Sequence, residues 1–339
     1  MKNNYFTLKK QSVNKWFSNN YSVSDWKFWF KLSFVIILFA VLLMSYLKPI
    51  IDSSIYVKQI NDILNNPETN IKTVEELITF AEGKNYDWLI ITKVNGENVF
   101  NIISTINFTV IGEAKTLHAN YQPFEEIWFR TSFFTLLSNI LVLVWMTTSF
   151  IKPKSEGEKG LISTNGAILT ATFITITFLI YQLSLRPTVI ATSLGNGESL
   201  LQAIFPSVTS VIENEVFHTF GPIAFVLYVI LGMNHDSKEN ISTKFLHKNW
   251  MQGIITLISY GVYAILRGLL KEWGGTAPTS MYAYPYFFLQ ITTPAKDGLL
   301  GIPGVAWFFM FVVIIAGIYI GFSTLYRYLI IKRIDKMNK

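Results

Sequence analysis

Six apolar runs separated by polar segments dominate the chain. They lie at about 32–51, 127–151, 162–185, 212–233, 250–270 and 302–325. An apolar run of about 20 residues is long enough to cross the hydrocarbon core of a bilayer as an α-helix. The first run is short between Lys31 and Lys48, but Trp26 and Trp29 at its start are typical of a membrane interface. The pattern predicts an all-α integral membrane protein built as a six-transmembrane-helix bundle.

One long polar segment, residues 52–123, separates the first two runs and carries more acidic than basic side chains. Within it, Val74–Glu82 predicts a short helix that is entered at Thr73. Glu76 stands three residues after Thr73, which is the spacing of a capping box. We expect a small α+β insert with the role of a spacer, a lid or a binding module.

The rest of the insert has the alternation of strands. Trp88–Val94, then Asn95-Gly96, then Glu97–Ile111 predicts a β-hairpin with a type I′ turn. Further along the chain, Arg186–Val211 is polar and contains serine and glycine, so we expect a re-entry region there. Ser199–Ile204 predicts a short interfacial helix within it.

Basic residues determine the expected orientation. They concentrate in a leader (1–31), two loops (152–160 and 234–249) and a tail (327–339). By the positive-inside rule these four segments face the cytoplasm. The chain is therefore expected in the cell membrane, with both termini cytoplasmic. The 52–123 insert is then extracytoplasmic, and residues 124–326 form a five-span helical core.

Composition removes several classes of function. The chain is 51% hydrophobic and only 15% charged, which fits a membrane protein. It has no cysteine, so disulfides, thiolate catalysis and Cys-ligated metals are excluded. No two of the four histidines have a metal-ligand spacing on one helix, and no basic cluster is interleaved with aromatics. We expect no metal, no cofactor and no nucleic-acid partner.

Polar residues inside the spans are the candidates for chemistry. They are Thr135, Asn139, Gln182, Glu215, His218 and Arg267. Thr135 and Asn139 are four residues apart, and Glu215 and His218 are three apart, so each pair shares a helix face. The expected topology places all six near the outer interface. Such convergence favours an intramembrane site.

Each of these residues also has a structural interpretation. Thr135 could bond back to its own helix, and Asn139 could join two helices. Arg267 could extend to the outer headgroups, and Glu215 could cap a helix or lie at headgroup level. His218 is a functional hypothesis by default, because an ionisable side chain inside a span is costly. Pro222 follows it by four residues and kinks the helix beside it.

A hydroxyl beside an imidazole is the minimal pair of nucleophile and base. Thr135 needs a base because threonine is a weak nucleophile on its own, and His218 can supply one. Arg267, with Asn139 or Gln182, could stabilise a developing oxyanion. These residue types predict hydrolysis or transfer of a lipid acyl group at the outer leaflet.

Short motifs occur in a characteristic order. They are Phe-Phe-Thr135-Leu-Leu-Ser-Asn139, Val-Phe-His218-Thr-Phe-Gly-Pro222, Leu-Arg267-Gly268 and Tyr-Ala-Tyr284-Pro285-Tyr286-Phe. Over about residues 124–325 the chain resembles the androgen-induced-gene family of multispan membrane threonine hydrolases and their bacterial six-span relatives.

That resemblance implies Thr135 as nucleophile, His218 as base and cleavage of fatty-acid esters of hydroxy fatty acids. Glu215, Tyr284 and Tyr286 are further candidates to orient His218 or to line a pocket. The chain departs from many of the bacterial relatives, which have paired histidines where it has His218-Thr219.

Two other hypotheses stay open. One is a non-enzymatic membrane protein, either a small-solute carrier or an assembly factor that binds a partner through 52–123. No inverted repeat or matched pair of broken spans supports a carrier. The other is that the polar cluster only holds the helices together. A membrane lipid is the expected partner of the hydrolase hypothesis.

Overall fold

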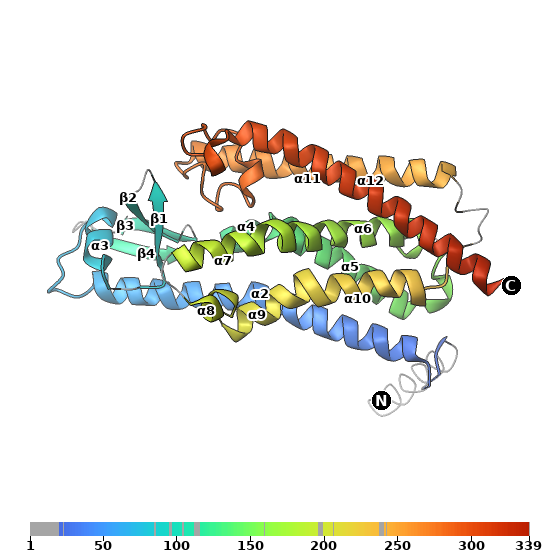
Figure 1. The fold of residues 1–339 in the computed structure, drawn as a ribbon. Helices are drawn as coiled ribbons and strands as arrows, with labels where there is room; N and C mark the ends of the chain where they lie inside the picture. Colours follow the sequence, from blue (N-terminus) through green and yellow to red (C-terminus); the bar gives the residue numbers. More distant parts are fainter. Residues whose placement is uncertain are drawn as a thin grey trace, which may run out of the picture. The chain divides into compact units, whose positions relative to one another are not determined.

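The structure is a computed structural model, and its elements are labelled in Figure 1. It describes residues 20–22, 24–84, 86–94, 97–103, 105–111, 116–158, 160–195, 199–205, 207–236, 241 and 243–338. The expected turn at Asn95-Gly96 lies outside the described residues.

The chain divides into two compact units. The first comprises Met1–Leu42, Phe134–Ser259 and Val312–Lys339, and the second comprises Leu43–Phe133 and Tyr260–Phe311. Three long helices, α2, α11 and α12, pass from one unit into the other. In the first unit, a cluster around the buried residues Phe173, Ile176 and Tyr319 forms part of the core.

Helix α2 runs from Trp26 to Leu64, well beyond the predicted span. The helix does not end where the predicted span does, because α2 passes through Pro49 and continues into the predicted insert. The continuation has a core of its own. Ile60 is fully buried against Leu77 and Trp88, which come from other parts of the insert.

The insert contains helix α3, Val74–Ala81, and four strands. The predicted capping box is confirmed: Thr73 accepts from the Glu76 N–H, and the Glu76 carboxylate accepts from the Thr73 N–H. This reciprocal pairing satisfies two backbone donors that a helix start would otherwise leave unbonded.

The strands form two antiparallel hairpins rather than one. Strand β1, Leu89–Val94, pairs with β2, Glu97–Ile102. Strand β3, Ile106–Ile111, pairs with β4, Thr116–Tyr121. The predicted single strand Glu97–Ile111 is therefore wrong. Strand β2 ends at Ile102 and β3 begins at Ile106, whose N–H donates to the Ile103 carbonyl.

The predicted second span is two helices, α4 (Pro123–Thr131) and α5 (Phe134–Ile151). Ser132 ends α4, and its hydroxyl donates to the Phe129 carbonyl at 2.5 Å. The Ser132 carbonyl accepts from the Tyr260 hydroxyl. These bonds satisfy polar backbone that the interruption removes from the helix.

The third apolar helix is longer than predicted. Helix α6, Thr164–Ile180, continues through a π-helical turn, Tyr181–Leu185, into α7, Arg186–Gly195. The predicted re-entry region therefore begins as helix. The short helix predicted within that region is confirmed as α8, Leu200–Ile204, which Ser199 caps.

The fourth apolar helix contains two π-helical turns. It begins with α9, Val208–Glu215, and passes through Val216–Phe220 into α10, Gly221–Leu227. It ends with the second π-helical turn, Tyr228–Gly232. Because the helix begins at Val208 rather than Ile212, His218 lies deeper in it than predicted.

The last two long helices are α11, Thr243–Trp273, and α12, Gly304–Met337. Helix α12 continues into the basic tail predicted from residue 327 and ends at Met337. Six helices in the described part of the chain are long and apolar enough to cross a membrane. They are Trp26–Leu64, Phe134–Ile151, Thr164–Gly195, Val208–Gly232, Leu246–Trp273 and Gly304–Met337.

Candidate functional site

Thr135 and His218 meet in the first unit. The Thr135 Oγ1 lies 3.3 Å from the His218 Nε2. On the other side of the ring, the His218 Nδ1 lies 3.1 Å from the Asn214 carbonyl oxygen. A carbonyl only accepts, so Nδ1 carries the proton and a neutral ring presents an unprotonated Nε2 to the hydroxyl. The pair therefore has the protonation pattern of a nucleophile and its base.

Local backbone chemistry explains how His218 is presented. It lies in the π-helical turn Val216–Phe220, where the Gly221 N–H donates to the Val216 carbonyl five residues back. Pro222 has no N–H, so it cannot continue this pattern to the Phe217 carbonyl. Single π-helical turns of this kind are common at functional sites.

Asn139 supplies the bond that Pro222 cannot. Its Nδ2 donates to the Phe217 carbonyl at 3.2 Å and to the Thr135 carbonyl at 2.8 Å. Asn139 is 1% exposed, and both its amide hydrogens are used on backbone oxygens next to the pair. This geometry makes Asn139 a clamp between α5 and the His218 turn rather than an oxyanion donor.

Ser138 fixes the same turn of α5 from its other side. Its Oγ lies 3.0 Å from the Thr135 carbonyl and 2.7 Å from the Thr177 Oγ1 of α6. Thr177 and Ser138 are both buried. The backbone of Thr135 is therefore held from α6 as well as from the fourth helix.

Tyr181 is a neighbour of His218 that the sequence motifs did not indicate. The two rings stack with centroids 3.8 Å apart and an angle of 14° between their planes. Tyr181 is the first residue of the π-helical turn that follows α6. An aromatic residue directly before Gln182, a predicted site residue, was the signal available in the sequence.

Gln182 and Glu215 form a polar chain beside the pair. The Gln182 Nε2 donates to the Thr219 Oγ1 at 2.7 Å, and its Oε1 accepts from Arg186. Arg186 forms an ion pair with Glu215 at 3.0 Å. The carbonyl of Asn214, rather than Glu215, thus orients the His218 ring among the described contacts.

Arg267, Tyr284 and Tyr286 belong to the second unit. The Arg267 Nη1 donates to the carbonyls of Tyr282 and Ala283 at 3.0 Å, so this buried side chain holds the loop after α11. Tyr284 packs on Gly268, where an added Cβ would lie 2.0 Å from the tyrosine ring.

The remaining predicted residue of that loop, Tyr286, stacks on Phe288. Burial, followed by the charge of Glu126, raises the pKa of the nearby Tyr282 to about 12. The hydrogen bonds of Arg267 and the packing of Tyr284 and Tyr286 together hold this loop in place.

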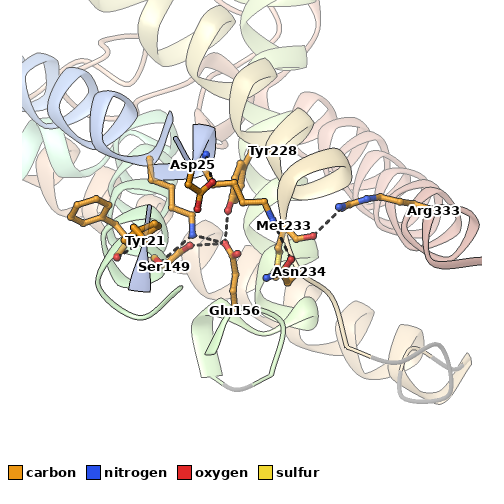
Figure 2. A network of polar contacts seen from close by, with 11 residues as sticks. Tyr21, Asp25, Ser149, Glu156, Tyr228, Met233, Asn234 and Arg333 are labelled. Carbon is orange, nitrogen blue, oxygen red and sulfur yellow. Dashed lines mark hydrogen bonds and ion pairs between the residues drawn. The ribbon is translucent and has the colours of Figure 1, made fainter. Parts of the chain in front are cut away.

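A second polar cluster of the first unit surrounds Glu156 (Figure 2). Its Oε1 accepts from Ser149 at 2.6 Å and from Tyr228 at 2.7 Å. Lys31 lies 3.1 Å from the same oxygen, and both charged side chains are 1% exposed. Burial and the Glu156 charge raise the pKa of Tyr21, whose hydroxyl donates to the Phe150 carbonyl. The hydrogen bonds here are made within the cluster, which is the pattern of a structural ion pair.

His235 lies just beyond the fourth helix. Its Nε2 is 2.7 Å from the Val229 carbonyl, and its Nδ1 is 3.3 Å from the Thr164 Oγ1. Burial lowers its pKa to about 4, and the charge of Arg333 acts in the same direction. A surface cavity of about 460 Å³ lies beside it, lined among others by Asp236 and Lys248.

Comparisons with protein-family models, curated proteins and solved structures find no match to this chain. Of the predicted residues, the structure brings Thr135, Asn139 and His218 into direct contact. Gln182 and Glu215 form a chain that joins the neighbouring turns.

Proposed function

We propose that this chain is an integral membrane hydrolase or acyltransferase that acts on the acyl ester of a lipid at the extracytoplasmic leaflet. The single observation that carries the proposal is the 3.3 Å contact between the Thr135 Oγ1 and the His218 Nε2, in a ring whose Nδ1 faces the Asn214 carbonyl. Six apolar helices and the four basic segments support the accompanying orientation in the cell membrane, with both termini cytoplasmic.

The reaction proceeds in two acyl transfers. The Thr135 oxygen attacks the ester carbonyl while His218 Nε2 takes the hydroxyl proton. The tetrahedral intermediate collapses, the bond to the alcohol breaks, and His218 returns the proton to the leaving alcohol. Water, or an acceptor alcohol, then attacks the acyl-threonine with His218 again as base. This releases the fatty acid or the new ester and restores Thr135.

Charge that develops on the carbonyl oxygen has a source of stabilisation at Thr135 itself. Thr135 is in the first turn of α5, where the helix dipole is positive. Asn139 does not fit the oxyanion role that the sequence suggested, because backbone carbonyls use its amide hydrogens. It instead keeps the two reacting side chains in register.

Labelling by a fluorophosphonate probe in isolated membranes tests the proposal. We expect wild-type protein and Thr135→Ser to be labelled, and Thr135→Ala and His218→Ala to lose labelling. The matched control is Thr148→Ala. Thr148 lies in the same helix, and its hydroxyl bonds to the Val144 carbonyl. If Thr135→Ala were labelled as strongly as wild type, the hydrolase proposal would be refuted and the partner-binding or carrier alternative would remain.

A further inference from the structure

We propose that Tyr181 is the positioning residue of His218: its ring fixes the plane of the imidazole so that Nε2 faces Thr135. The inference rests on the proposed function, but its geometry is independent of any substrate. The two rings are nearly parallel and 3.8 Å apart, which is close packing over a whole face.

Two separate constraints are needed to orient an imidazole. A stacked ring fixes the plane but accepts a 180° flip about the Cβ–Cγ bond, because the flip leaves the plane unchanged and presents the equivalent opposite face. The hydrogen bond from Nδ1 to the Asn214 carbonyl selects one flipped form and one tautomer. That bond alone leaves the ring free to tilt about it. Tyr181 and the Asn214 carbonyl together leave one arrangement, with Nε2 toward Thr135.

The backbone on both sides is adapted to this contact. Tyr181 opens one π-helical turn and His218 lies inside another. The next residue in each turn makes a second contact, from the Gln182 Nε2 to the Thr219 Oγ1 at 2.7 Å. Two successive contacts in register join two uncommon turns, and such turns persist only where the surroundings support them.

Stacking also suits the chemistry of the ring. During the reaction His218 becomes a cation, and an aromatic face stabilises a cation placed over it. This contribution requires the aromatic ring and not the phenol hydroxyl. Phenylalanine at position 181 therefore preserves the proposed role, whereas an aliphatic side chain of similar size removes it.

The first test reads the histidine directly. The chain has four histidines, so ¹⁵N-histidine labelling and subtraction of the His218→Gln spectrum assign the His218 ring nitrogens. We expect one neutral tautomer, with the proton on Nδ1, in wild type and in Tyr181→Phe. In Tyr181→Leu and Tyr181→Met we expect mixed tautomers or exchange broadening. Unchanged His218 signals in both aliphatic variants would overturn the inference.

The second test is the rate of fluorophosphonate labelling. We expect Tyr181→Phe to stay near wild type and the aliphatic variants to slow roughly tenfold or more, a part of what a general base contributes. If labelling depends on Thr135 but not on the ring at 181, the inference fails while the proposed function stands. A Phe variant as impaired as Leu also refutes it, since the hydroxyl would then carry the role.

The two proposals fail separately. If labelling proves independent of Thr135, the hydrolase is refuted, and the nitrogen spectra still decide whether Tyr181 orients the ring. Two aliphatic variants are used because Met and Leu fill the space differently, so that one folded variant suffices.

Discussion

Lys31 and Glu156 form a buried ion pair, so replacing either residue alone should have a large effect on the free energy of unfolding. Lys31 comes from α2, while Glu156 follows α5 and also bonds to Tyr228 in the fourth helix. We predict that Lys31→Met or Glu156→Gln alone destabilises the protein by about 3–5 kcal/mol, because each leaves a buried group unpaired. The double variant should lose much less than the sum.

The measurement for this pair is thermal unfolding in detergent, with tryptophan fluorescence as the signal. Lys48→Met is the matched control, since Lys48 lies in the same helix and pairs with Asp52 at an exposed position. It should change stability by less than about 1 kcal/mol. If Lys48→Met costs as much as Lys31→Met, burial is not the cause.

His235 gives a prediction about pH. Its folded pKa of about 4 is below the ordinary value of 6.5, so the folded state binds fewer protons between these limits. Stability is fully present above pH 6.5 and falls as the pH drops toward 4, by at most about 3 kcal/mol. The charges that act on it are Arg333, Glu156 and Lys27.

Unfolding midpoints measured from pH 7.5 to 4.5 test this dependence. His235→Gln should flatten the curve in that window, whereas His247→Gln, at an exposed position, should leave it as in wild type. A slope that survives His235→Gln would assign the dependence to other groups.

At the scale of elements, the Asn139 amide replaces the backbone donor that Pro222 lacks. Pro222 cannot donate to the Phe217 carbonyl, and the Asn139 amide does so from α5. We predict that Asn139→Leu costs about 1–3 kcal/mol, the usual range for leaving a buried polar group unbonded. In a Pro222→Ala background the cost should shrink, because alanine at this position restores a backbone N–H.

Midpoints of the wild type, the two single variants and the double variant form the cycle that measures this coupling. Additive effects would refute the coupling between Pro222 and Asn139.

Pro222→Ala should also reduce fluorophosphonate labelling, even if its unfolding midpoint does not fall. The reason is that an α-helical turn at 216–220 would rotate His218 away from Thr135.

Elements were partly predictable for a clear physical reason. Apolar length is a local property, so hydropathy located the helices that are long enough to cross a membrane. The extension of α2 to Leu64 depends on burial of Ile60 by distant parts of the insert, which no local window contains. The second hairpin was missed because Glu97–Ile111 is rich in β-branched residues and contains no glycine or proline to mark its break.

The site divides in the same way. Motif order singled out Thr135 and His218, and the structure places them in contact. Tyr181 was not indicated, because stacking depends on which faces two helices present to each other. The π-helical turns that set those faces are joined by the hydrogen bond between Gln182 and Thr219, which lie far apart in the sequence.

At the scale of the whole molecule, the six apolar helices and the alternation of basic segments with acidic or balanced ones make one joint prediction. An even number of crossings puts both ends of the chain on one side, and the lysines and arginines assign that side to the cytoplasm. The expected extracytoplasmic leaflet of the proposed reaction depends on this assignment.

The chain has no native cysteine, so single cysteines introduced one at a time report topology without background. We expect Lys72→Cys in the insert and Ala277→Cys after α11 to react with a membrane-impermeant maleimide in intact cells. Lys154→Cys and Asn338→Cys should react only after permeabilisation; all four positions are exposed. Labelling of Asn338→Cys in intact cells would reverse the orientation. Different behaviour of Lys72→Cys and Ala277→Cys would instead refute the number of crossings between them, because four helices must return the chain to the side it left.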